Sequence, residues 1–438
     1  MMILFFISSG LFLGWSLGAN DAANIFGTAV GTRMIKFTQA AAIASIFVIL
    51  GAVLQGAGTT NTLSQLGNVD ALGGAFTVAL CSALIVAIMT KNRLPVSTGQ
   101  AIVGSIVAWC YFTSKPVDYG ILTVLVSSWI YGPILGAIFA ALLYLYMRKF
   151  IRTTRIHVIK LDILLRYALI VTGAFGAYSL GANNIANVMG VFVQAASIQI
   201  NFLNVNFDTV QILFLLGGFS IAIGIITYSK KVMETVGGEI MTLTPENAIV
   251  VVLAQALVLF LFSSSSLSDA LISMGLPAIP LVPVSSTQVV IGSVLGIGLV
   301  KGVQEVKFGV LRNIALGWVL TPLLSGLLTF FSLFFVQNVF DIGISEGGHI
   351  YNSHNDMTSA PIIINFSNDY IYLLVIAIIG LFILGLIYLY ILYIQTKSYD
   401  KLHKIKMAQQ KVHLEYKRAL SELEKNLLED PNFQKDDE

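Results

Sequence analysis

The sequence predicts an all-α polytopic membrane protein, and three observations support that class. The composition is 56% apolar and only 11% charged, whereas soluble domains carry about 25% charged residues. Apolar stretches of about 20 residues, the length that crosses a bilayer as a helix, recur from end to end. Short polar sequence motifs inside these stretches, which we call repeated phrases, occur twice in the same order. No basic patch with interleaved aromatic residues suggests a nucleic-acid partner.

The apolar stretches predict about 11 membrane crossings, within a range of roughly 10 to 12 because glycine and proline interrupt several of them. The first stretch is expected to be a retained helix and not a signal peptide, since no basic residue precedes it. The expected crossings are 2–32, 38–58, 73–90, 95–113, 118–147, 163–196, 208–228, 246–264, 281–300, 310–337 and 369–395.

Basic residues set the expected orientation of these crossings. Lysines and arginines follow the odd-numbered crossings, whereas loops 59–72, 197–207, 265–280 and 338–368 contain neither. Only Lys115 departs from this pattern. Because positive charge collects in cytoplasmic loops, the N-terminus is predicted outside and the C-terminus in the cytoplasm, in a plasma membrane.

Three phrases are repeated in the two halves of the chain. The segment 18–27 (GANDAANIFG) returns as 181–190 (GANNIANVMG), and 95–98 (PVST) returns as 283–287 (PVSST). Trp129 and Pro133 are likewise matched by Trp318 and Pro322. An odd number of crossings per half inverts the second copy, which predicts an inverted-topology repeat with discontinuous helices.

The repeat predicts how the chain is organised into parts. The last part, a C-terminal tail, is expected to pair with the tail of a second protomer or to be solvated. Leucines at helical spacing in the tail fit a short coiled coil that forms a homodimer, and a solvated tail is the alternative. The expected parts are membrane repeat 1 (1–147), a basic cytoplasmic loop (148–162), membrane repeat 2 (163–337), an extracellular loop (338–368), a last transmembrane helix (369–395) and an amphipathic tail (396–438).

The first repeated phrase places an acidic residue, Asp21, in the middle of a crossing, where a charge is expensive. Glycine allows the helix to unwind, and freed carbonyls with Asn and Asp side chains can coordinate a small hard cation such as Na⁺. The alternative is helix packing through small residues, which does not explain Asp21. The expected cation or coupling residues are Asn20, Asp21, Asn183 and Asn184.

The second repeated phrase supplies hydroxyls beside a proline that favours a helix start. Such hydroxyls donate to oxyanion oxygens without adding fixed charge, and the alternative is that they only cap helices. With the last Asn of each first phrase, the expected substrate-binding residues are Asn24, Ser97, Thr98, Asn187, Ser285, Ser286 and Thr287, and Gln100 and Gln288 are possible pocket residues.

On these phrases, and on residues 235–245, the chain resembles the PiT family of inorganic phosphate transporters. The resemblance implies alternating-access symport of inorganic phosphate with a cation between inverted repeats. Two departures stand out, because the family usually has Asp where this chain has Asn184, and Thr-Thr-His where it has Gly99-Gln100 and Thr287-Gln288. The coupling ion, Na⁺ or H⁺, therefore stays open, and so does sulfate, arsenate or another tetrahedral oxyanion as substrate.

Other functional classes are less well supported. An anion channel is the second choice, because inverted repeats inside one chain favour alternating access. An enzyme is not expected, since no paired catalytic carboxylates or His-containing cluster lies in a crossing. We therefore expect no catalytic residues and no cofactor other than the co-transported Na⁺ or H⁺, with phosphate and the lipid bilayer as partners.

Overall fold

The structure is a computed structural model that describes residues 2–91, 96–154, 156–196, 198–202, 205–236, 244–302, 308–345 and 362–363. The chain divides into two units, Met1–Asn365 and Phe366–Glu438, and all described residues belong to the first. The last predicted crossing (369–395) and the predicted tail (396–438) therefore lie outside the described residues.

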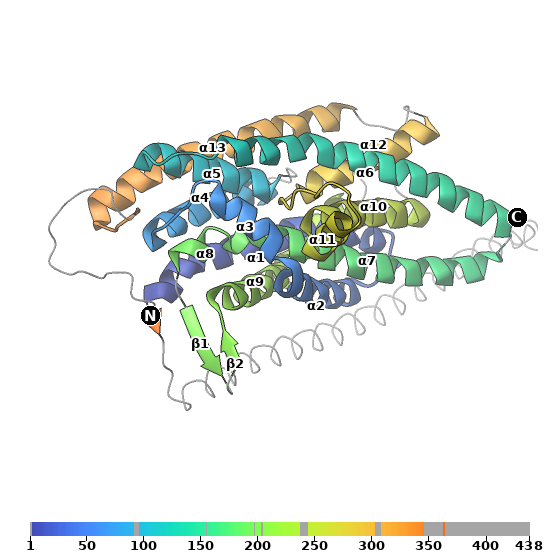
Figure 1. Cartoon of the computed structure of the whole chain (residues 1–438). Coiled ribbons are helices and arrows are strands. Elements are labelled where there is room, and N and C mark those ends of the chain that lie inside the picture. The colour runs from blue at the N-terminus through green and yellow to red at the C-terminus, as the bar shows by residue number, and fades with distance from the viewer. Residues whose placement is uncertain are drawn as a thin grey trace, which may run out of the picture. The chain divides into compact units, whose positions relative to one another are not determined.

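The described chain is almost entirely helical, as predicted (Figure 1). A short hairpin of β1 (Ile198–Phe202) and β2 (Val205–Phe207) pairs Ile200 with Phe207, and β3 (Ile362–Ile363) lies parallel to β1. The helices are α1 (Met2–Gly31), α2 (Phe37–Gln55), α3 (Ala57–Gln65), α4 (Leu72–Lys91), α5 (Thr98–Thr113), α6 (Tyr119–Thr154), α7 (Val158–Met189), α8 (Phe192–Ala195), α9 (Thr209–Val236), α10 (Pro245–Ser263), α11 (Ser265–Ser273), α12 (Ser286–Lys301) and α13 (Phe308–Phe340).

Eight of the described helices are long and apolar enough to span a membrane, namely α1, α2, α4, α6, α7, α9, α10 and α13. Helices α5 and α12 have only 16 residues each. At 1.5 Å per residue they measure about 24 Å, less than the ~30 Å of hydrocarbon. Each starts after extended backbone at Ser97 or Ser285, so the predicted crossings 95–113 and 281–300 each join an extended part to a short helix.

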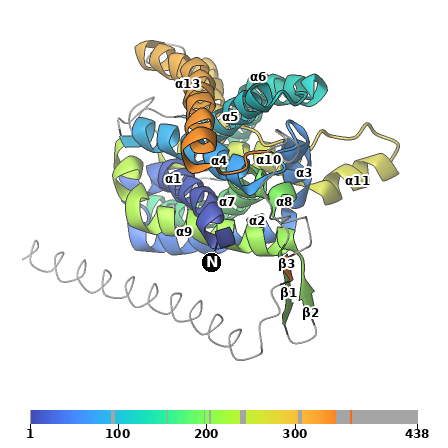
Figure 2. The same ribbon diagram turned by 90° about the vertical axis from the view of Figure 1, so that its left-hand side faces the viewer.

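Helix packing in the two halves is reciprocal. Helix α1 packs on α9 while α7 packs on α2, and α5 packs on α13 while α12 packs on α6. Likewise α4 contacts α13, and α10 contacts α6. In both views α6 and α13 lie on one side of the unit and α2 and α9 on the other (Figure 2). Elements that carry the same phrase therefore make equivalent contacts.

The unwinding expected at the first repeated phrase does not occur. Helix α1 is continuous through residues 18–27, and α7 is continuous up to Met189. The glycines serve close helix contact instead, because a Cβ on Gly18 would lie 2.0 Å from the Ile221 carbonyl oxygen, and one on Gly181 would lie 2.0 Å from that of Val48. The breaks in the helices fall before α5 and α12.

The connection predicted as a basic loop (148–162) is mostly helical. Helix α6 continues to Thr154, and α7 begins at Val158. The charged residues of this segment are good helix formers, and no proline or glycine interrupts them. The helices therefore extend past the apolar part of each crossing.

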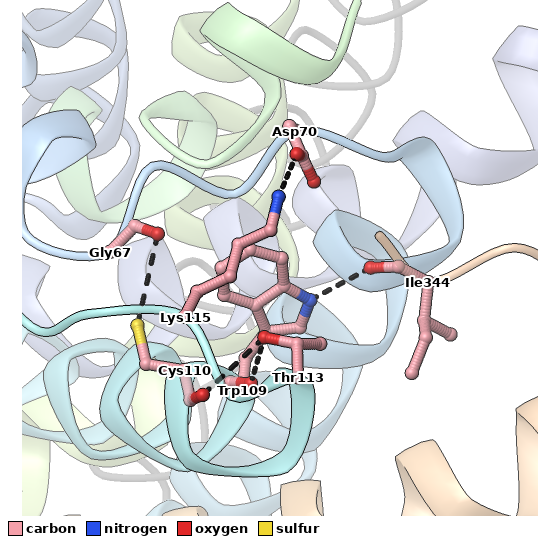
Figure 3. Close-up of polar contacts among 7 residues, drawn as sticks. All are labelled: Gly67, Asp70, Trp109, Cys110, Thr113, Lys115 and Ile344. Atoms are coloured by element: carbon pink, nitrogen blue, oxygen red, sulfur yellow. Dashed lines mark hydrogen bonds and ion pairs between the residues drawn. The ribbon is translucent and has the colours of Figure 1, made fainter. Parts of the chain in front are cut away.

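The C-terminal end of α5 is anchored by polar contacts (Figure 3). Lys115 forms an ion pair with Asp70 and lies 5.5 Å from the centre of the Trp109 ring. The indole nitrogen of the buried Trp109 donates to the carbonyl of Ile344, 2.8 Å away. Lys115, the exception to the charge pattern, is thus neutralised by a neighbouring carboxylate.

The close approach at Gly18 generates a stability prediction. Gly18→Ala forces a methyl group onto the Ile221 carbonyl, and overpacking of this kind costs about 1–3 kcal/mol. We expect a lower melting temperature of the purified protein in detergent. Gly31→Ala is the matched control on the same helix, because nothing lies within 4 Å of its added Cβ. Equal melting temperatures for the two variants would contradict the packing of α1 on α9.

Candidate functional site

The predicted side chains gather where four segments meet in the interior of the unit. These segments are the middle of α1, the last turns of α7, and the N-terminal ends of α5 and α12 with the residues before them. Asn24 is partly buried, and every other predicted side chain is at most 6% exposed. The repeated phrases thus form an enclosed polar cluster inside apolar helices.

Asp21 is held by two donors in this cluster. One carboxylate oxygen accepts from Ser286 Oγ at 2.6 Å, and the other accepts from Asn20 Nδ2 at 2.7 Å. Neither of the two ion pairs found among the described residues involves Asp21. Since a buried charge needs partners, these two neutral donors are what stabilise the carboxylate in the absence of a cation.

The segment before α5 is tied to α1 and α12 through one carbonyl. The Val96 oxygen accepts from Asn20 Nδ2 and from Thr287 Oγ1, each at 3.2 Å. Asn24 Nδ2 in turn donates to Thr287 Oγ1 at 3.2 Å and lies 3.5 Å from Ser286 Oγ. The first phrase is therefore bonded to the start of both short helices.

The second copy makes a related but different set of bonds. Asn183 donates to the Val284 carbonyl at 2.7 Å and accepts from the Val284 amide at 3.0 Å, which fixes the segment before α12. Asn184 donates to the Leu180 carbonyl of its own helix and accepts from Asn187 at 2.9 Å. Among the described residues, Asn184 therefore bonds only within α7, whereas Asp21 bonds across to α12.

Several buried oxygens of the predicted residues have no hydrogen-bond partner among the described residues. These are Thr98 Oγ1, Gln100 Oε1, Asn187 Oδ1 and Gln288 Oε1. A buried polar atom without a partner costs about 1–3 kcal/mol, so these oxygens favour a bound ligand or water. Gly99 faces Asn187, because a Cβ added there would lie 3.4 Å from the Asn187 amide. Within the described ranges the side chains of Gln100 and Gln288 form no hydrogen bond with the other predicted residues.

Ser97 and Ser285 are N-caps, as the capping alternative predicted. Their hydroxyl oxygens accept from the backbone N–H of Gln100 at 3.3 Å and of Gln288 at 3.4 Å. Each hydroxyl keeps its own proton for donation to another group. Capping and ligand binding are thus compatible at both serines, and their contact with substrate stays a prediction.

Two buried serines that the sequence reasoning missed lie one helical turn before the cluster residues of α1 and α7. Ser16 and Ser179 are at most 1% exposed, and their hydroxyls have no partner among the described residues. Each precedes the first Asn of its phrase by one helical turn, on the same helix face. The signal was available, since the repeat begins two residues earlier, as Ser16-Leu17 and Ser179-Leu180.

The cluster combines features that suit an anion and a cation. The N-terminal ends of α5 and α12 both lie in it, and free N–H groups with the helix dipole favour negative charge there. Asp21 and the amide oxygens are hard ligands for a cation. No group of three or more His, Cys, Asp or Glu side chains that could hold a metal ion occurs within the described ranges.

The two hydrogen bonds between the Asn183 side chain and the Val284 backbone generate a second stability prediction. In Asn183→Asp the carboxylate cannot donate to the Val284 carbonyl. A carboxylate oxygen then faces the Val284 carbonyl oxygen in place of the present 2.7 Å hydrogen bond. We expect a loss of about 1–3 kcal/mol, measured as a lower melting temperature of the purified protein. An unchanged melting temperature would show that this contact does not hold the start of α12.

Comparisons with known proteins identify the family of the chain. The model of the phosphate transporter family matches residues 17–329. A candidate phosphate permease of Methanocaldococcus jannaschii is 29% identical over 321 residues, covering 73% of this chain and 93% of that protein. One of Pyrococcus abyssi is 28% identical over 396 residues, covering 73% and 94%.

A solved structure shares the fold. It is described as the sodium-dependent phosphate transporter, is 24% identical, and covers 77% of this chain and 100% of that chain with a TM-score of 0.61. The family match spans the described elements from the first repeated phrase in α1 to the middle of α13, including all four segments of the polar cluster. The chain therefore belongs to the phosphate transporter family.

Proposed function

We propose that this phosphate permease is a secondary active transporter that imports inorganic phosphate together with Na⁺ or H⁺ by alternating access. One observation carries the proposal. A carboxylate buried inside the helices, Asp21, is bonded to a hydroxyl at the N-terminal end of α12, Ser286. A ligand for a cation and a hydrogen-bond donor for an anion are thus neighbours, an arrangement that allows the two ions to influence each other's binding directly.

The anion part of the proposal rests on the two short helices. Their N-terminal ends provide free N–H groups and positive dipole ends, and Thr98, Ser286 and Thr287 add hydroxyls there. The caps Ser97 and Ser285 and the amides Asn24 and Asn187 complete the proposed set. Neutral donors suit an anion that must bind and then leave.

The cation part of the proposal rests on Asp21 with Asn20. The second copy offers only amides, Asn183 and Asn184, and both are bonded to backbone carbonyls in this structure. The related sodium-dependent phosphate transporter supports Na⁺ as the first ion to test. A driving ion is needed, because moving one negative charge into a cell against 100 mV costs about 2.3 kcal/mol.

The reciprocal packing of the two halves supports alternating access. Equivalent elements exchange partners, with α1 on α9 and α7 on α2. A site between two such halves can be exposed by rocking one half against the other. In this proposal the halves are inverted repeats, the N-terminus lies outside and the C-terminus lies in the cytoplasm of a plasma membrane.

Uptake of labelled phosphate into proteoliposomes tests the proposed function. With an inward Na⁺ or H⁺ gradient as the sole driving force, we expect phosphate to accumulate above its external concentration, and excess unlabelled sulfate to leave this uptake unchanged. Equilibration without accumulation would indicate a channel, and inhibition by sulfate would indicate a permease for another oxyanion.

The position of Asp21 generates a sharper prediction. Asp21→Asn keeps the shape of the side chain and removes its charge, so we expect gradient-driven uptake to fall at least 100-fold, the order expected when a buried charged partner is lost. The variant should still fold, because an amide oxygen still accepts from Ser286; its amide nitrogen then faces Asn20 Nδ2, so a modest fall in melting temperature is expected. Uptake at the unmodified level would exclude Asp21 as the coupling group.

A further inference from the structure

The hydroxyl of Ser286 has a single proton, and the structure shows where it goes. Ser286 Oγ lies 2.6 Å from an oxygen of Asp21. A carboxylate only accepts hydrogen bonds, so the serine is the donor. Ser286 is 3% exposed and is the first residue of α12, where a bound oxyanion would need the same proton. The proton cannot serve both acceptors.

We propose that Ser286 couples the two ligands, because its hydroxyl donates to Asp21 while the cation site is empty and to phosphate once Na⁺ occupies Asp21. This inference rests on the proposed function. It goes beyond that function by assigning to one hydroxyl group a share of the energetic link between the ions, beside the compensation of the Asp21 charge by Na⁺.

Na⁺ and the Ser286 hydroxyl compete for the Asp21 carboxylate, and this competition explains why Na⁺ binding favours phosphate binding. Na⁺ is a hard cation that binds carboxylate and amide oxygens, and at Asp21 it takes over the lone pairs that Ser286 now fills. The hydroxyl is then free to turn towards phosphate. Without Na⁺, phosphate would have to take the proton from a buried carboxylate and bind beside an uncompensated negative charge. Each ligand therefore strengthens the binding of the other.

The second half of the chain provides a hydroxyl without this link. Thr98 begins α5 as Ser286 begins α12, and both follow a capping serine. The position that corresponds to Asp21 holds Asn184, which bonds within its own helix. Thr98 Oγ1 is buried and has no partner among the described residues. Its proton is available to phosphate with or without Na⁺, so Thr98 is the matched control.

Equilibrium binding of labelled phosphate to the purified full chain tests the assignment, in Na⁺ buffer and in K⁺ buffer of equal ionic strength. Na⁺ should tighten phosphate binding to the unmodified protein by about 10-fold or more, within the usual range for coupled sites. In Ser286→Ala, the Na⁺ effect on phosphate affinity should shrink by about threefold or more, and the remainder is the effect of Na⁺ on the charge of Asp21. In Thr98→Val, affinity should weaken by a similar factor in both buffers.

Sodium binding gives a second readout, which a purely structural role of Ser286 would not change. Ser286→Ala removes the donor that competes for Asp21, so Na⁺ should bind the phosphate-free variant at least as tightly as the unmodified protein. Ser286→Thr keeps the hydroxyl and should keep the Na⁺ effect on phosphate. If Ser286→Ala does not fold, Ser286→Cys replaces it, because a thiol is only a weak donor.

The outcomes separate this inference from the function it rests on. A full Na⁺ effect in Ser286→Ala, or equal loss of the Na⁺ effect in Thr98→Val, would overturn the role of Ser286 and leave phosphate transport intact. Phosphate binding to the unmodified protein that does not respond to Na⁺ would also overturn it. No phosphate binding in any buffer would instead refute the proposed function.

Discussion

The extended backbone at the start of α5 and α12 needs hydrogen-bond partners, and the helices around it supply them. In a bilayer every backbone N–H and carbonyl must find a partner inside the protein. The extended segments before α5 and α12 leave such groups free, and the asparagines of the repeated phrase bind them, Asn20 at Val96 and Asn183 at Val284. The first phrase therefore supports the second, which explains why the two are repeated together.

These hydrogen bonds also explain how polar side chains are accommodated among apolar helices. Glycines at the first position of each phrase allow α1 and α7 to approach α9 and α2 closely enough for backbone contact. The polar faces of α1 and α7 then lie against the short helices and not against lipid. One difference between the two copies stands out, because Asp21 has a carboxyl group where Asn184 has an amide, and of these two side chains Asp21 bonds across to a short helix within the described residues.

Much of the fold could be predicted from the sequence, because long apolar runs end at basic or turn-forming residues. Helix α4 and helix α10 begin and end within one residue of the predicted crossings. The continuous path of α1 through Gly18 could not be predicted, since glycine permits both unwinding and close packing, and the deciding partner, Ile221, is far away in sequence. For the same reason the sequence could predict which polar side chains lie in one region but not the hydrogen bonds among them. The hydroxyl of Ser286 could equally have capped its own helix, as Ser285 does.

The repeated phrases form one enclosed site, in which we expect a cation at Asp21 and phosphate at the short helices to be neighbours. An experimental structure of the full chain with phosphate and Na⁺ tests this placement. We expect a tetrahedral anion within hydrogen-bond distance of Thr98 and Ser286, and cation density on Asp21 Oδ2 in place of the Ser286 bond. An anion bound away from both short helices, or an Asp21 that faces lipid, would contradict it.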